Sequence, residues 1–203
     1  MRNTAFHSLG LATLLLLGAC SADSSNPTSP ESSLTVAPFQ AEVTGAVTSN
    51  LRGENFDYTA QGILSNDADG KPLLQLGFNA RTKPEKQQGG IESGSFSLRF
   101  EGNILAVGTY NIPTKSDAST YGGTYAYQKA DTLSSRSQSY NTSSGTLTVT
   151  GVYGNNLVGT ISLKASKSYG TVVTNGQLTE ETANGEEVTV TIAFQIQVSD
   201  LRY

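Results

Sequence analysis

Residues 188–198 read Val-Thr-Val-Thr-Ile-Ala-Phe-Gln-Ile-Gln-Val, with an apolar side chain at every second position from Val188 to Val198. Successive side chains of a β-strand point to opposite faces, so this alternation predicts a strand with one buried and one solvated face. One-sided burial of this kind is typical of antiparallel sheets. The stretch therefore predicts an antiparallel all-β fold.

The same alternation recurs upstream, interrupted by Gly, Asn and Asp. It predicts further strands over 39–47, 56–64, 73–78, 95–100, 121–127, 146–152, 157–163 and around 176–179. The polar tracts 80–92 and 112–120 are expected to be loops, and no segment after residue 35 has a helical period. The sequence thus predicts a single antiparallel β-sandwich or β-barrel of about 8–10 strands over residues 36–203.

The N-terminus has the parts of an export signal. Arg2 precedes an apolar run over 9–17, and small residues follow that run. The run is about half the length of a membrane-spanning helix, which needs about 20 apolar residues. We therefore expect a cleaved signal peptide over residues 1–19. The segment 20–35 is rich in serine and contains two prolines, so we expect it to be a disordered tether.

Leu17, Gly18, Ala19 and Cys20 resemble the lipobox of bacterial lipoproteins, and Cys20 is the only cysteine of the chain. The resemblance implies that the Cys20 thiol receives a diacylglyceryl group, that the chain is cut before it, and that the new amino group is acylated with a palmitate-type chain. Ser21, where an aspartate would signal retention, implies the outer membrane and leaves its periplasmic and outer faces both open. The alternative is a secretory signal with an incidental cysteine.

Charge and composition exclude several function classes. Removing residues 1–19 takes away one of 13 basic side chains and none of the 17 acidic ones, which moves the net charge from −4 to −5. This acidic balance argues against nucleic acid as a partner. The only histidine (His7) and the only methionine (Met1) lie in the expected signal peptide. A Ser-His-Asp triad, a Cys-His nucleophile and a Cys/His zinc site are therefore excluded, and we expect no metal or other cofactor.

Four short motifs occur in order along the chain. They are Gly-Thr-Tyr-Asn-Ile at 108–112, Ser-Gly-Thr-Leu-Thr-Val at 144–149, Leu-Val-Gly-Thr-Ile-Ser at 157–162 and Thr-Asn-Gly-Gln-Leu at 174–178. This order resembles uncharacterised cell-envelope lipoproteins over roughly residues 37–180. The resemblance implies an all-β envelope domain and brings no catalytic residues.

Three tyrosines form the strongest candidate site. Tyr121, Tyr125 and Tyr127 fall on one alternation phase and would share one face of a strand. An exposed tyrosine face could bind a glycan or a partner protein, because the ring offers apolar area and a hydroxyl. The favoured interpretation is that these rings cover the sheet or fill its core, and the binding face is the alternative.

Two clusters of carboxylates have more ordinary interpretations. Residues 65–70 read Ser-Asn-Asp-Ala-Asp-Gly, which resembles the start of a calcium loop, but Leu76 stands where that loop needs a glutamate. A hairpin turn is favoured there. The pairs 180–181 and 186–187, all glutamates, flank Asn184-Gly185. This favours a type I′ hairpin with a solvated tip, and an acid pair is the alternative.

The function expected from these observations is a non-enzymatic outer-membrane lipoprotein. Its β-domain would serve in binding or in envelope assembly, with an envelope protein or a glycan as partner. A glycan or small-ligand module that uses the tyrosine face is the first alternative. A carboxylate-dependent glycan hydrolase is the second, and it needs two carboxyl groups roughly 5–10 Å apart in a cleft.

Overall fold

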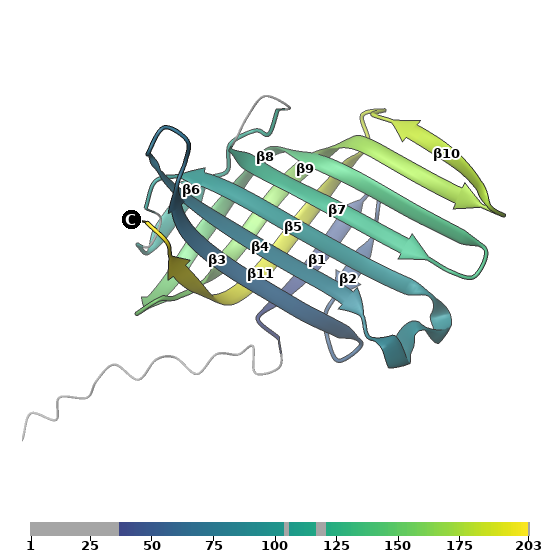
Figure 1. The fold of residues 1–203 in the computed structure, drawn as a ribbon, viewed down its shortest axis with the longest axis horizontal. Coiled ribbons are helices and arrows are strands. Elements are labelled where there is room, and N and C mark those ends of the chain that lie inside the picture. Colours follow the sequence, from purple (N-terminus) through teal and green to yellow (C-terminus); the bar gives the residue numbers. More distant parts are fainter. Residues whose placement is uncertain (1–36, 104–105, 117–120, 203) are drawn as a thin grey trace, which may run out of the picture. The chain divides into compact units, whose positions relative to one another are not determined.

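The computed structural model describes residues 37–103, 106–116 and 121–202, and it consists of strands and one short 3-10 helix (Figure 1). The strands are β1 (Phe39–Gly45), β2 (Ser49–Leu51), β3 (Phe56–Asn66), β4 (Pro72–Thr82), β5 (Ile91–Glu101), β6 (Gly108–Asn111), β7 (Gly122–Ala130), β8 (Ser134–Tyr153), β9 (Asn156–Thr174), β10 (Gln177–Thr182) and β11 (Glu187–Asp200). The helix η1 spans Pro84–Gly89. The prediction of an all-β fold is confirmed. The signal, the tether, Cys20 and the lipobox residues Leu17, Gly18 and Ala19 lie outside the described residues.

All these strands belong to one 11-stranded sheet that closes on itself. Neighbours pair in the order β9, β8, β7, β5, β4, β3, β11, and β11 pairs again with β9. Six of these seven pairings are antiparallel, as expected, but β11 pairs with β3 in parallel over three residues beginning at Val198 and Gly62. A Cβ atom on Gly62 would lie 2.7 Å from Val198 Cγ2, so glycine permits this close approach. The sheet is therefore mixed, and its closure is barrel-like.

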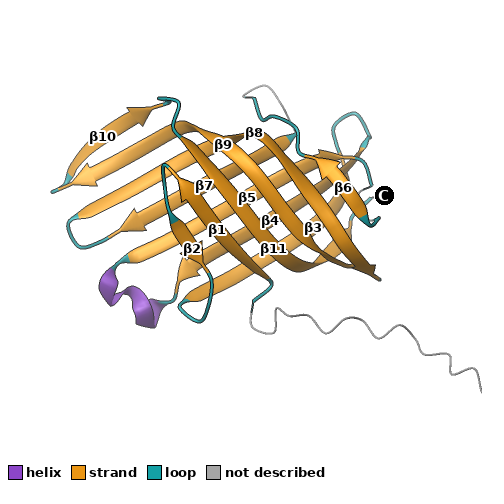
Figure 2. Cartoon of the chain, turned by 180° about the vertical axis from the view of Figure 1, so that it is seen from behind, coloured by secondary structure: helices purple, strands orange, loops and turns teal. Residues whose placement is uncertain are grey.

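The closed sheet is flattened into two layers. Figure 1 shows β3, β4, β5 and β7 in front of β11, β1 and β2, and Figure 2 shows the second layer from its own side. The long strands β8 and β9 take part in both layers. The first half of β8 pairs with β7, and its second half pairs with β6. Likewise β9 pairs first with β11 and then with β10.

β8 and β9 change the phase of their inward side chains on the way. The β8–β9 register shifts between Ser139 and Tyr140, between Thr142 and Ser144, and between Val149 and Gly151. Each such irregularity inserts a residue and bends the strand. As a result, even-numbered residues of β8 face inward up to Thr142, and odd-numbered ones do so from Leu147. The bulges let one strand serve both layers.

The core between the layers is aromatic at its centre. Phe39 and Phe78 meet edge to face at 5.3 Å between ring centroids, and Phe78 lies 5.5 Å from Phe194. Phe96 stacks on Tyr125 at 4.6 Å. Each ring is almost fully buried, and burial of one such side chain contributes about 1.5–3 kcal/mol to stability. The rings form a continuous chain that ends at Tyr140, which lies 5.8 Å from Tyr125.

Candidate functional site

Of the three tyrosines considered for a binding face, Tyr125 and Tyr127 lie in the core, which is the interpretation that the sequence favoured. Tyr125 is 0% exposed and Tyr127 is 5% exposed. Their shared phase was predicted correctly, but the face they share points inward because β7 is covered by the second layer. Tyr121 lies just outside β7, and its hydroxyl donates to Asp67 Oδ2 at 2.5 Å. The three side chains therefore do not form an exposed face, and the alternative of a binding face is wrong.

The residues around Asp67 form the predicted turn. Asp67 Oδ1 accepts the N–H groups of Asp69 and Lys71 at 2.9 and 2.8 Å, in the hairpin between β3 and β4. The hydrogen bond from Tyr121, followed by that from the Lys71 N–H, holds the pKa of Asp67 below its ordinary value. The carboxylate is thus occupied by the turn. Within the described ranges, no three His, Cys, Asp or Glu side chains gather as a metal ion would require.

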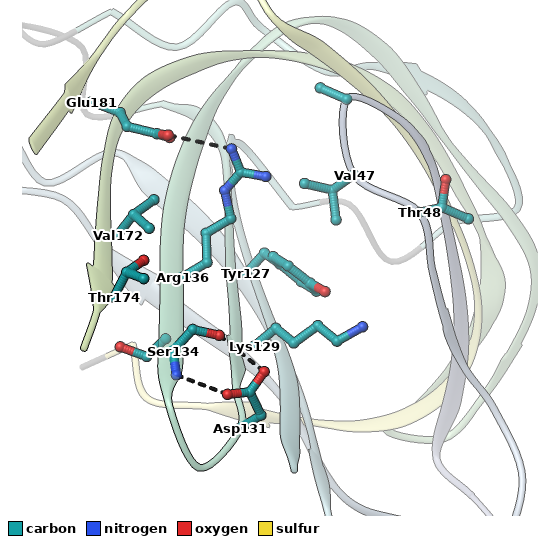
Figure 3. Close-up of a pocket in the computed structure, with 12 residues that line it drawn as sticks. Val47, Thr48, Tyr127, Lys129, Asp131, Ser134, Arg136, Val172, Thr174 and Glu181 are labelled. Atoms are coloured by element: carbon teal, nitrogen blue, oxygen red, sulfur yellow. Dashed lines mark hydrogen bonds and ion pairs between the residues drawn. The ribbon is translucent and has the colours of Figure 1, made fainter. Parts of the chain in front are cut away.

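A cavity of about 590 Å³ opens at one end of the closed sheet (Figure 3). It lies between the turn that joins β1 to β2 and the inward face of β7, β8, β9 and β10. Its lining residues are Ala46, Val47, Thr48, Tyr127, Lys129, Asp131, Ser134, Ser135, Arg136, Val172, Thr174 and Glu181. The lining thus combines apolar side chains, hydroxyls and both signs of charge.

The strand register explains which side chains line the cavity. Lys129 of β7 stands directly opposite Arg136 of β8, and Arg136 stands opposite Val172 of β9. The next inward row begins with Tyr127 and continues with Gln138, followed by glycine on β9 and glutamate on β10. These side chains follow the same inward phase as Tyr125. They reach the cavity because the second layer ends before them.

Beside the cavity, a buried lysine joins two glutamates. The Lys167 side chain is 0% exposed, and its ammonium donates to Glu181 Oε2 at 2.7 Å and to Glu186 Oε2 at 3.2 Å. Gln138 Nε2 donates to Glu181 Oε2 at 3.3 Å, and the Tyr140 hydroxyl donates to Gln138 Oε1 at 3.0 Å. The aromatic chain of the core therefore continues directly into a charged network.

The network fixes the charge of its members. Burial lowers the pKa of Lys167, but the hydrogen bonds to Glu181 and Glu186 outweigh burial and leave it above its ordinary value. The Lys167 ammonium, and less strongly Arg136, hold the pKa of Glu181 below its ordinary value. The Asn184 amide and then Lys167 lower the pKa of Glu186. Both glutamates therefore stay ionised at neutral pH, and neither is poised as a proton donor.

The absence of a side chain at Gly170 leaves space for the Lys167–Glu181 ion pair. Gly170 lies opposite Glu181 on β10 and opposite Gln138 on β8. A Cβ atom there would lie 3.1 Å from Lys167 Cε and 3.3 Å from Glu181 Oε2. Both distances are tighter than ordinary contacts, so a side chain at this position would push the ion pair apart.

The prediction of a hairpin at Asn184-Gly185 is wrong, although residues 182–185 are exposed as expected. β10 and β11 do not pair with each other, because both lie along the same edge of β9. Asn184 caps this connection, donating from Nδ2 to Glu186 Oε1 at 2.7 Å. The glutamates at 181 and 186 do come together, as the acid-pair alternative required. They meet around the Lys167 ammonium, however, which neutralises them.

The sequence pattern singled out Tyr127 and Glu181 of the cavity, but not its two cations, Lys129 and Arg136, nor the adjoining Gln138 and Lys167. Lys129, Arg136, Gln138 and Lys167 were not candidates, because polar side chains in an alternating strand are ordinarily assigned to the solvated face. One signal was available for Lys129: it shares the phase of Tyr125 and Tyr127. The signal for Arg136, Gln138 and Lys167 depends on the bulges and on closure of the sheet.

No protein-family model, no curated protein and no solved structure matches this chain. Within the described residues, no helix is long and apolar enough to cross a membrane. The function is therefore inferred from the cavity and from the chain's own residues.

Proposed function

We propose that this protein is a lipid-anchored binding protein of the bacterial outer membrane. Its closed sheet would hold a small ligand in the cavity at the end of β7, β8, β9 and β10. The anchor is inferred from the lipobox pattern that ends at Cys20, and the binding role from the cavity. The cavity carries the proposal, because its volume of about 590 Å³ lies in the range of small-molecule sites.

The composition of the lining supports binding. Small-molecule sites are mostly apolar and hold a few placed polar groups that orient the ligand. Here Val47, Val172 and the Tyr127 ring supply the apolar area, while Lys129 and Arg136 supply charged donors. Of the three tyrosines, Tyr127 thus contributes to the proposed site, as a ring of the cavity lining and not as part of an exposed face.

The carboxylates of the lining favour binding over hydrolysis. Asp131 accepts the N–H groups of Leu133 and Ser134, each at 2.8 Å, and these bonds hold its pKa below the ordinary value. The pKa of Glu181 is lowered as well. A glycoside hydrolase needs one carboxyl group that stays protonated near neutral pH as a general acid. Neither carboxylate of the lining meets that need.

The chain contains no tryptophan, which gives a direct test. Thr48→Trp would place a single tryptophan at the exposed mouth of the cavity. In the full chain, its emission should change saturably when neutral sugars, sugar acids and sugar phosphates are titrated. The control reporter is Thr191→Trp, on the outward face of β11, and its emission should not change.

A second variant separates binding in the cavity from binding elsewhere. Val172→Phe fills the cavity, whereas Thr171→Phe adds the same ring on the opposite face of β9. Combined with Thr48→Trp, the first should weaken binding at least tenfold and the second should leave it unchanged. A panel that leaves Thr48→Trp emission unchanged throughout, in a correctly folded protein, would overturn the proposed function.

A further inference from the structure

Two cations stand side by side on one wall of the cavity. Lys129 and Arg136 are register partners on β7 and β8, and both line the cavity. Directly opposite side chains in an antiparallel pair have Cβ atoms about 4.5–5.5 Å apart, and like charges placed so are destabilising. In the view of Figure 3 the two side chains lie on either side of the Tyr127 ring, and the Arg136 guanidinium is turned toward Glu181.

The neighbouring carboxylates are already engaged. Asp131 is held by the backbone of its own turn, and the Ser134 hydroxyl donates to Asp131 Oδ2 at 2.9 Å. Glu92 stands opposite Lys129 on β5, and burial followed by the Glu92 charge raises the pKa of Tyr127 to about 12. Among the described residues, the ion pairs within 4 Å do not include Lys129.

Arg136 has donors to spare for a ligand. Its Nη2 atom contacts Glu181 Oε1 at 3.3 Å, and the other oxygen of that carboxylate accepts from Lys167 at the shorter distance of 2.7 Å. A guanidinium carries five N–H donors in a planar fork that matches an oxyanion. The contact with Glu181 orients the guanidinium and leaves most of its donors for another acceptor.

We propose that the ligand carries an oxyanion, a carboxylate or a phosphate, that binds between the Lys129 ammonium and the Arg136 guanidinium. This inference rests on the proposed function of the cavity. The oxyanion separates the two like charges and accepts charge-assisted hydrogen bonds from both. The body of the ligand then lies against Val172, Val47 and the Tyr127 ring.

Three probes with one body test the proposal. Glucose, glucuronate and glucose 6-phosphate are titrated against the Thr48→Trp reporter in the full chain. At least one anionic probe should bind about tenfold or more tightly than glucose, since one hydrogen bond to a charged group contributes about 1.5–3 kcal/mol. The preference between glucuronate and glucose 6-phosphate shows which oxyanion the cavity takes. The advantage should shrink as salt is added.

Matched variants assign the effect to the two cations. Lys129→Gln and Arg136→Gln should each remove most of the anionic advantage, measured as the ratio of the affinity for the better anionic probe to the affinity of the same variant for glucose. Lys164→Gln, an exposed lysine on β9 away from the cavity, is the control and should leave this ratio unchanged. Equal binding of all three probes would overturn the proposed oxyanion site, and it would leave the proposed function of the cavity standing. Absence of any response, across these probes and the wider panel, would overturn both.

Discussion

The same two strands, β8 and β9, line two different interiors. At one end their inward side chains are Leu147, Val149, Leu157 and Ile161, packed against β11 and almost fully shielded from solvent. We call this the apolar end. At the other end the inward side chains of β7, β8, β9 and β10 are Lys129, Arg136, Gln138, Lys167 and Glu181, which we call the polar end. An inward position in a closed sheet is therefore not always a hydrophobic position.

The difference follows from where each end of the sheet is covered. The apolar end lies between two complete layers, so an uncompensated polar group there would lose its hydrogen bonds to water. The polar end extends beyond the second layer, so the cavity can hydrate its charges. Lys167 stands at the boundary between the two. It is fully buried and for that reason has two carboxylate partners.

The largest effect on stability is expected at the apolar end. Phe194→Ala removes a ring that packs on Phe78 at 5.5 Å, and it should lower the free energy of unfolding by about 3–5 kcal/mol. Thr191→Ala, on the outward face of the same strand, should change it by less than about 0.5 kcal/mol. Urea unfolding followed by circular dichroism measures both. Similar losses for the two variants would contradict the assignment of the inward face.

The second largest loss of stability is expected when Lys167, the lysine at the boundary, is replaced. Lys167→Met leaves Glu181 and Glu186 facing each other without the ammonium, and should cost about 2–3 kcal/mol. We expect a smaller loss than the roughly 3–5 kcal/mol of a fully buried ion pair, because the two carboxylates are 27% and 33% exposed. Adding Glu181→Gln and Glu186→Gln to Lys167→Met should restore much of the loss. A triple variant no more stable than Lys167→Met would show that repulsion between the carboxylates is not the cause.

Acid should weaken the polar end before the apolar end. The pKa values of Glu181 and Glu186 are lower in the folded chain than in the unfolded one. Their contribution is therefore complete above their ordinary value of 4.5 and disappears as pH falls through the folded values. Hydrogen exchange of β10 amides, measured from pH 7 downward after correction for intrinsic rates, should show this loss. Amides of β11 opposite Ile161 should be less affected, and equal effects would contradict the comparison.

The smallest expected effect on stability is the difference between two stacked tyrosines at the boundary, Tyr125 and Tyr140. The Tyr140 hydroxyl donates to Gln138, whereas the buried Tyr125 hydroxyl has no hydrogen-bond partner among the described residues. Tyr140→Phe should therefore cost about 1 kcal/mol, and Tyr125→Phe should be neutral or slightly stabilising. Thermal unfolding of the two variants measures the difference. A larger loss for Tyr125→Phe would mean that its hydroxyl is engaged in the folded protein.

Alternation predicted the apolar end well and the polar end poorly. The apolar alternation of β11 is visible in its sequence, and so is that of the second half of β8. The first half of β8, from Ser134 to Asn141, offers no apolar alternation, because its inward residues include Arg136 and Gln138. No strand was predicted there. β2 and β6 were missed because three or four residues are too few for a periodic signal.

Two Asn-Gly pairs show a second limit of sequence reasoning. Asn175 and Gly176 both have positive φ, at 50° and 80°, and they join β9 to β10 as a type I′ turn requires. Asn184-Gly185 has the same sequence signal but joins strands that do not pair with each other. The outcome depends on the length of β9, whose edge accommodates β10 and β11 one after the other. That length is set by closure of the whole sheet and is absent from the local sequence.

If Lys129 and Arg136 are placed for a ligand rather than for folding, replacing them should not destabilise the chain. The most direct measurement is the free energy of unfolding of the double variant Lys129→Gln/Arg136→Gln in the absence of ligand. Because the two cations oppose each other, the double variant should be at least as stable as the original chain, to within about 0.5 kcal/mol. A loss of more than about 1 kcal/mol would show that the pair serves the fold, and would contradict its placement for a ligand.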